Sequence, residues 1–248
     1  MPKFGLGVNL EKNNSGHEAT VTPGYVTDGL VGNWDAGDAA SYPGSGTTWT
    51  DLTGNNDGVL TNGPVYTASP NPNFAFDGDN DYVELGSINS ANPLSLFGVT
   101  GFAIEFWIQA DLSGDPLQRI IAKSNGGAAS GGYSVFRNGS ALDFYINTVS
   151  VISFATGFVG WKQFVLTRNS SNVVRFYRDG VLSTTTTLPA AATPFPSTTT
   201  NARIATWNHS TGREYKGELG IVRVYNVELT TAEVLQNYDA NKAAYGLS

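Results

Sequence analysis

Residues 219–225 read Leu-Gly-Ile-Val-Arg-Val-Tyr, and residues 229–234 read Leu-Thr-Thr-Ala-Glu-Val. The first run is typical of a buried strand, because β-branched and aromatic side chains pack well on a pleated surface. The second fits a capping box, in which Thr230 and Glu233 each accept a hydrogen bond from the other's backbone N–H. Leu229 is placed to pack on Val234 across the first turn. We therefore predict a strand followed directly by a short helix that begins near Thr231.

Upstream of this strand and helix, short apolar runs alternate with turns rich in Gly, Asn and Asp. Residues 102–108 alternate strictly, which places one set of side chains on a core face and the other on the opposite face. The predicted core set is Phe102, Ile104, Phe106 and Ile108, and the opposite set is Glu105 and Trp107. Asp179-Gly180 is a tight hairpin signal. Residues 183–200, rich in Thr, Ala and Pro, are predicted to be a connection rather than a core element.

About a dozen such strands with one helical segment predict an all-β fold, namely an antiparallel β-sandwich jelly roll with one short C-terminal helix. We expect one domain over residues 28–248, preceded by an arm over residues 1–27. Four apolar residues in the arm alternate with Gly and Asn, as in a short strand: Phe4, Leu6, Val8 and Leu10. We expect another chain or a symmetry-related copy to order this segment. The alternative is that it covers an edge of its own sandwich.

Composition excludes several classes of function. The chain has 14 Lys and Arg against 21 Asp and Glu, a net charge of −7, and no basic cluster, which argues against nucleic acid as a partner. It has no cysteine and two histidines, which excludes disulfides and makes a thiolate or His-rich metal site untenable. The N-terminus lacks the apolar core of a signal peptide, and no run of about 18 apolar residues occurs. We expect synthesis in the cytoplasm and no membrane insertion.

Several motifs together carry a family resemblance. In chain order they are Phe76-Asp77-Gly78, Asp81-Tyr82-Val83, residues 102–107, Trp161, the turn at residues 176–180, and Arg223-Val224-Tyr225-Asn226 followed by Leu229-Thr230. On these residues the chain resembles the laminin-G-like branch of the concanavalin A-like lectin/glucanase jelly rolls, over about residues 28–245. Many secreted members carry an acidic pair just before the Val-Arg-Ile-Tyr-Asn run. This chain has Gly220 and Ile221 there, so no role of that pair carries over.

Two further stretches look most like the versions of this domain found in bacteriophage structural proteins: residues 35–49 and residues 233–247. The resemblance implies a non-enzymatic structural or attachment module of a virion, such as a capsid or tail decoration protein. It implies other virion proteins as partners, a homo-oligomeric arrangement in the particle, and outward-facing loops that are candidates for binding host-surface glycans. A glycan-binding adhesin is the first alternative, and a glucanase-like glycoside hydrolase is the second.

The loop Asp77-Gly78-Asp79-Asn80-Asp81 is the most strongly charged spot in the chain. Alternating carboxylates resemble the first half of a calcium loop, and calcium is the one candidate cofactor. The loop is not an EF-hand, because Tyr82 and Ile88 stand where that motif needs Gly and Glu. The resemblance supports calcium, since some laminin-G-like domains bind it at a sandwich edge. The competing interpretation is a tight turn capped by its own side chains.

Aromatic residues next to polar loop residues are candidates for sugar binding, because a ring stacks on the apolar face of a pyranose while polar groups bind its hydroxyls. The candidates are Trp207, Asn208, His209, Tyr42 and Tyr133. The competing interpretation is packing in the core or at its rim. A glycosidase needs two carboxylates that face each other across a cleft. Only Glu105 and Asp111 approach the spacing of the jelly-roll glucanases, and their partner positions are not acidic. We predict no enzyme activity.

Overall fold

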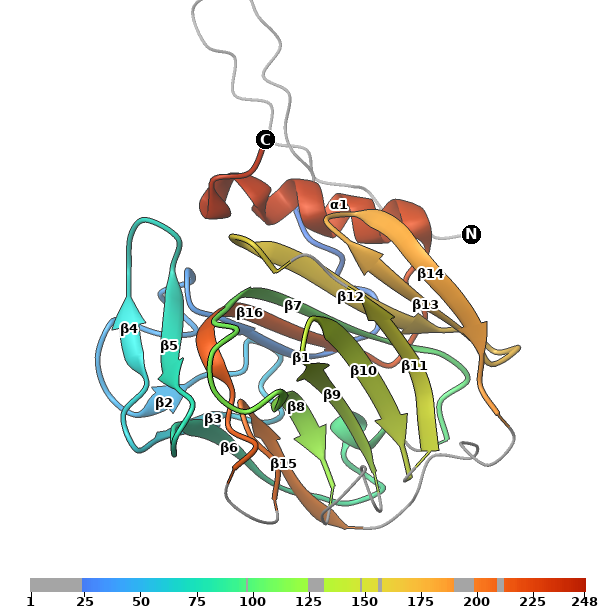
Figure 1. Ribbon diagram of the computed structural model, residues 1–248, viewed down its shortest axis with the longest axis horizontal. Helices are drawn as coiled ribbons and strands as arrows, with labels where there is room; N and C mark the ends of the chain where they lie inside the picture. The colour runs from blue at the N-terminus through green and yellow to red at the C-terminus, as the bar shows by residue number, and fades with distance from the viewer. Residues whose placement is uncertain are drawn as a thin grey trace, which may run out of the picture.

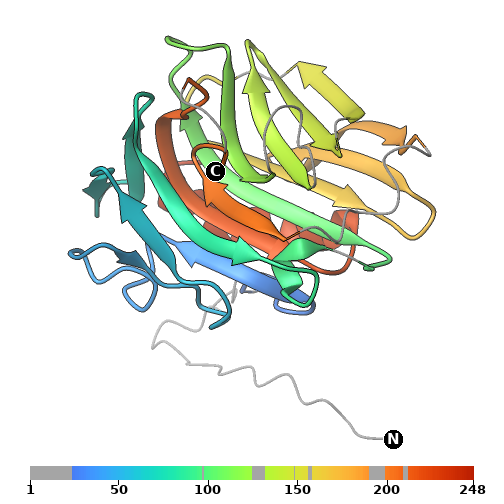
Figure 2. The same ribbon diagram turned by 90° about the horizontal axis from the view of Figure 1, so that it is seen from below.

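The computed structural model describes residues 24–96, 98–124, 132–147, 149–155, 158–189, 199–208 and 212–248. Within them, sixteen strands form two antiparallel sheets that pack face to face (Figures 1 and 2). One α-helix, α1 (Thr231–Asn241), lies across the outer face of one sheet, and the short 3₁₀ helix η4 (Lys242–Tyr245) follows it. A second 3₁₀ helix, η1, spans Pro93–Ser95. The predicted all-β sandwich with one C-terminal helix is confirmed.

The sheet under α1 is called the first sheet. Its strands, in spatial order, are β14 (Val181–Thr187), β13 (Val173–Arg178), β12 (Lys162–Arg168), β7 (Phe102–Ala110), β16 (Lys216–Tyr225), β5 (Asn73–Asp77) and β4 (Val65–Thr67), with β1 (Leu30–Asp35) also paired to β16. The strand predicted over residues 219–225 is thus part of the long strand β16. One of its edges pairs with β7, while the other pairs with β5 in its first half and with β1 in its second half.

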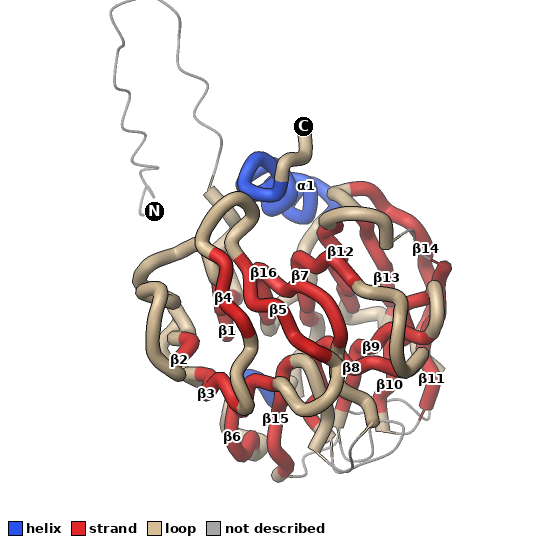
Figure 3. Tube along the Cα trace, turned by 60° about the vertical axis from the view of Figure 1, so that its left-hand side comes forward, coloured by secondary structure: helices blue, strands red, loops and turns tan. Residues whose placement is uncertain are grey.

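The sheet turned away from α1 is called the second sheet (Figure 3). Its strands, in spatial order, are β11 (Val149–Ala155), β10 (Ala141–Ile146), β9 (Tyr133–Asn138), β8 (Leu117–Lys123), β15 (Thr200–Ile204), β6 (Tyr82–Ile88), β3 (Gly58–Thr61) and β2 (Thr48–Trp49). The order β8–β15–β6 brings together strands that are far apart in the sequence. Among the described residues, no helix is long and apolar enough to cross a lipid bilayer.

The main core lies between the two sheets. The predicted inward set of β7, Phe102, Ile104, Phe106 and Ile108, belongs to it, and each of these side chains is fully buried. Side chains also alternate along the strands of the second sheet. In β10 the side chains that point into the core are Leu142, Phe144 and Ile146. The intervening residues of β10 face outward from the sandwich.

Much of the outer face of the first sheet is also buried, because α1 packs on it. The capping box is present as predicted, with Thr230 and Glu233 bonded reciprocally. Leu229 and Val234 share a small apolar cluster with Tyr177 of β13. Farther along, Trp107 stacks against the ring of Tyr245, 4.7 Å between centroids. The helix therefore covers the part of this face over β7, β12, β13 and the second half of β16.

Tyr25 and Val26, at the N-terminal end of the described residues, contact the domain. Val26, which the sequence analysis assigned to the arm, is buried beside α1. Its backbone N–H donates to Asn237 Oδ1 at 2.8 Å, and its carbonyl accepts from the Tyr225 hydroxyl at 3.1 Å. The ring of Tyr25 lies 4.0 Å from the guanidinium of Arg223. Tyr25 and Val26 therefore pack on the domain, which the sequence analysis did not predict because their partners lie about 200 positions away in the chain. The predicted arm residues Phe4, Leu6, Val8 and Leu10 lie outside the described residues.

The structure also tests the predicted turn at Asp179-Gly180 and the predicted connection over residues 183–200. The hairpin turn at Asp179-Gly180 is confirmed, since both residues have positive φ, 51° and 76°. The interpretation of residues 183–200 as a plain connection was wrong for its first part, because Val181–Thr187 form the edge strand β14. Four consecutive Thr residues favour a strand, and the pairing with β13 decides it.

Two truncations test whether residues 24–27 stabilise the domain. A chain that begins at Asp28 should be less stable than one that begins at Gly24 by about 2 kcal/mol or more, the value of a buried Val and its hydrogen bonds. Urea denaturation of both chains measures the difference. Equal midpoints would show that Tyr25 and Val26 add nothing and that the boundary at residue 27 was right.

Candidate functional site

A pocket of about 360 Å³ lies on the outer face of the second sheet, over strands β8, β9 and β10. These strands are neighbours on the side of the molecule away from α1 (Figure 1). The volume lies within the usual range for small-molecule sites. This part of the second sheet is thus open to a ligand. A second pocket, of about 410 Å³, lies over the ends of β5, β7 and β16 in the first sheet.

The floor of the pocket is a row of side chains set by strand register. Arg119 of β8 lies opposite Phe136 of β9, and Phe136 lies opposite Asp143 of β10. Tyr145, two residues farther along β10, is on the same face, and its ring centroid lies 5.1 Å from that of Phe136. All four alternate with residues that point into the core, so the pleat itself directs them outward.

Arg119 is a buried cation held between two aromatic rings. Its guanidinium carbon lies 3.9 Å from the ring centre of Phe136 and 4.8 Å from that of Trp207. The residue is only 4% exposed. Nη1 donates to the carbonyl of Leu117, while the buried Nε has no hydrogen-bond partner. Burial lowers the pKa of Arg119 to about 10, and the nearby positive charge of Arg213 adds to the effect. The ring stacking fixes the plane of the guanidinium.

Asp143 is a buried anion on the same floor, and it is also 4% exposed. Its Oδ2 accepts a hydrogen bond of 2.9 Å from Asn138 Nδ2, while its buried Oδ1 has no partner. Buried polar atoms are normally hydrogen-bonded, so each exception requires an explanation. Here Arg119 offers a donor without a partner, and Asp143 offers an acceptor without one. Both side chains line the same pocket.

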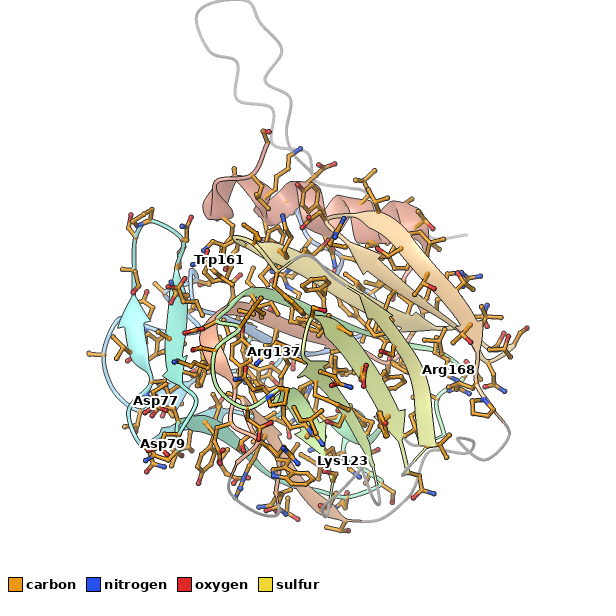
Figure 4. All side chains as sticks on the ribbon, in the orientation of Figure 1. Asp77, Asp79, Lys123, Arg137, Trp161 and Arg168 are labelled. Atoms are coloured by element: carbon orange, nitrogen blue, oxygen red, sulfur yellow. The ribbon has the colours of Figure 1, made fainter. Side chains whose placement is uncertain are left out.

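The wall of the pocket comes from the segment between β15 and β16. Trp207 is 7% exposed, and Arg213 forms an ion pair of 2.8 Å with Asp115. Arg137, which lies inside the sandwich (Figure 4), donates from Nη2 to the carbonyl of Asp115 at 2.8 Å. A buried arginine thus supports the loop that holds Arg213.

The residues predicted to bind glycans do not lie together in the structure. Trp207 lies in the pocket, Asn208 follows it as a half-buried residue, and His209 lies outside the described residues. Tyr42 and Tyr133 do not line this pocket, and both are buried. Tyr42 packs edge-on against Phe74 in the core, and Tyr133 is 1% exposed. Their hydroxyls donate to backbone carbonyls inside the protein, so both rings are core residues and unavailable to a sugar.

Two of the three carboxylates of the acidic loop accept hydrogen bonds from the backbone of the loop itself. Asp77 Oδ1 accepts from the backbone N–H groups of Asp79 and Asn80, and Asp81 Oδ2 accepts from the N–H of Asp77. These N–H groups lower the pKa of Asp77, whereas burial raises that of Asp81. The loop lies at the end of β5 (Figure 4). Over the part of the chain that the structure describes, no three acidic or His residues are grouped to hold a metal ion. The capped turn is the interpretation that the geometry supports.

The carboxylate nearest to a glucanase layout is not in a cleft. Glu105 is fully buried on the outer face of the first sheet. Its Oε1 accepts from Gln163 Nε2 at 2.9 Å, and its Oε2 accepts from Asn237 Nδ2 of α1 at 2.7 Å. Asp111 is exposed and forms an ion pair with Lys216 at 3.4 Å. Glu105 is therefore occupied in holding the helix and is not exposed to a substrate.

Sequence reasoning found only Trp207 among the residues that line the pocket and missed the other seven: Leu117, Arg119, Phe136, Asn138, Asp143, Tyr145 and Arg213. Alternation along residues 141–146 was the available signal, since it places Asp143 and Tyr145 on the solvent side of a strand. The pocket itself forms only because β15 pairs with β8 and brings the segment after β15 next to these strands. Local sequence patterns do not predict which distant strands pair.

Two antiparallel sheets packed face to face place the chain among the double-sheet jelly rolls. The laminin-G-type model of the concanavalin A-like lectin/glucanases superfamily matches residues 77–235, well over half of the chain. The chain belongs to this superfamily. A search among curated proteins finds no match.

Solved structures share this fold at low sequence identity. The binding domain of botulinum neurotoxin DC in complex with SialylT aligns with a TM-score of 0.64 and 14% identity over 86% of this chain and 52% of that one. A Trypanosoma rangeli sialidase aligns with a TM-score of 0.65 and 14% identity over 96% of this chain and 37% of the sialidase. The botulinum neurotoxin type G receptor binding domain gives a TM-score of 0.62 and 14% identity, over 89% and 54%. The chain thus spans about half or less of each, and the likeness is one of fold.

The hydrogen bonds of the acidic loop generate a prediction about calcium. Because the carboxylates of Asp77 and Asp81 already accept from the backbone of the loop, added Ca²⁺ should leave the melting temperature unchanged. A ligand that binds only the folded state would raise it by mass action. Thermal melts in Ca²⁺ and in chelator measure this, and a stabilisation of several degrees by Ca²⁺ would restore the calcium hypothesis.

Proposed function

We propose that the protein is a non-enzymatic glycan-binding module and that the pocket over β8, β9 and β10 is its binding site. One observation carries the proposal: Arg119 and Asp143, both nine-tenths buried, line the same aromatic pocket, and each has a buried polar atom without a hydrogen-bond partner. A sugar presents hydroxyl groups that both donate and accept hydrogen bonds. It can therefore satisfy a guanidinium and a carboxylate at once.

The other pocket residues fit the same ligand. Tyr145 is half-exposed and offers a ring for the apolar face of a pyranose, and Trp207 forms the wall opposite. Asn138 is exposed, and its amide already contacts Asp143, so the two form a ready hydroxyl-binding pair. The pocket volume of about 360 Å³ suits one or two sugar residues rather than a long buried chain.

The comparisons support this assignment. The superfamily is named for lectins and glucanases, and among the solved structures of the same fold are a toxin binding domain in complex with SialylT and a sialidase in complex with sialic acid. A binding role is favoured over hydrolysis because Glu105 is fully buried and hydrogen-bonded beneath α1. The glucanase-like alternative would need a second carboxylate facing Asp143 across the pocket. Asp115, the nearest candidate, is engaged by Arg213.

We propose in addition that the module is carried on a virion, where it acts in attachment beside other virion proteins and in several copies. The resemblance of residues 35–49 and 233–247 to bacteriophage structural proteins motivates this setting. It is compatible with an adhesin role, since an attachment module binds glycans on the host surface. Removal of residues 1–23 tests the setting: particles should lose the protein while the isolated domain stays folded. Incorporation at the normal level would contradict a role of this segment in assembly.

The binding proposal is tested by titrating a panel of mono- and disaccharides into the protein and following binding by NMR and calorimetry. Tyr145→Ala and Asp143→Asn should each weaken binding by about tenfold or more, the usual effect of losing an aromatic anchor or a charged hydrogen bond. Tyr82→Ala is the matched control, because Tyr82 lies on β6 of the same sheet beneath Arg203, outside the pocket. No binding across the panel, or binding that neither variant changes, would overturn the proposal.

A further inference from the structure

The pocket contains two guanidinium groups at one end. The backbone N–H of Arg119 donates to the carbonyl of Arg213 at 2.9 Å, so their two segments lie side by side. Both side chains lie over the same indole, with guanidinium carbons 4.8 Å and 5.9 Å from the ring centre of Trp207. Burial lowers the pKa of Arg119, and the nearby positive charge of Arg213 lowers it further. This end of the pocket is therefore positive.

The negative charges nearby compensate for only part of this. Asp115 pairs with Arg213 and also accepts from the backbone N–H of Leu117. Within the described residues, no carboxylate forms an ion pair with Arg119. Asp143 lies two strands away from Arg119, across Phe136, and is bonded to Asn138. The pocket thus has a cationic end at Arg119 and Arg213 and an acceptor end at Asp143 and Asn138.

We propose that the ligand is an acidic sugar, of the uronic or sialic acid class, whose carboxylate lies against Arg119 and Arg213 while its hydroxyls reach Asp143 and Asn138. This inference rests on the glycan-binding function proposed above and specifies its ligand. A planar carboxylate matches the fork of donors on a guanidinium, and the aromatic rings hold the Arg119 fork in place. The carboxylate also supplies an anion for Arg119, which has no ion-pair partner among the described residues.

Matched sugars test the inference directly. Glucuronate and glucose differ at one carbon, as do galacturonate and galactose, so each pair isolates the carboxylate. N-acetylneuraminate is the probe for the sialic class. By calorimetry at low ionic strength, the acids should bind at least about tenfold tighter than their neutral partners, the effect of one charge-assisted hydrogen bond. The preference should shrink as salt is added.

Arg213→Gln should abolish the preference for the acid over its neutral partner, because it removes one of the two charges that face the carboxylate. Arg175→Gln is the matched control. Arg175 is 28% exposed and pairs with Glu228 at 2.7 Å, and Arg213 is 30% exposed and pairs with Asp115 at 2.8 Å, but Arg175 lies on the first sheet. Arg119→Lys is a second variant that keeps the charge and loses the planar fork, and it should also reduce the preference. Circular dichroism confirms that each variant is folded.

The outcomes separate this inference from the function on which it rests. Equal binding of acidic and neutral sugars, weakened by Tyr145→Ala, would overturn the acidic ligand and leave glycan binding intact. A preference for the acid that Arg213→Gln does not change would also overturn it, since the carboxylate would then lie elsewhere. Failure of every sugar to bind would remove both proposals.

Discussion

The buried ion pair between Glu105 and Arg223 is the interaction on which the arrangement of the molecule depends. Both side chains are fully buried, and Nη1 of Arg223 lies 3.5 Å from Oε1 of Glu105. The carboxylate also accepts from Trp107, Gln163 and, on α1, Asn237. Burying two charges is costly unless every lone pair and proton has a partner. Here the partners come from two neighbouring strands and the helix, so α1 can sit in only one register on the first sheet.

This constraint assigns different roles to the two faces of the sandwich. With α1 and the segment at Val26 fixed over the first sheet, much of its outer face is covered, and the one acidic residue of β7 is hydrogen-bonded to the helix. The second sheet keeps an open outer face, on which polar and aromatic side chains gather over three adjacent strands. A fold shared by binding modules and hydrolases thus places its candidate site here on the sheet without the helix.

Short-range sequence patterns were enough to predict the C-terminal helix, the central strand and one hairpin turn. The capping box at Thr230, the alternation of residues 102–108 and the turn at Gly180 each depend on a few neighbouring residues, and each is present as expected. The site depends on contacts between distant segments. Trp207 meets Arg119 only because β15 pairs with β8, and Tyr133 is lost to the core because its strand is covered on that face. A single sequence shows which residues alternate, but the order of the strands decides what they meet.

The most direct test of this account is a crystal structure of the protein with a bound sugar, obtained by soaking with the tightest ligand of the saccharide panel. The account predicts one sugar residue over β8, β9 and β10, within hydrogen-bond distance of Arg119 and Asp143 and stacked on Tyr145. A sugar bound instead at the loops around Asp77, or anywhere on the face covered by α1, would contradict the claim that the pocket of the second sheet is the functional site.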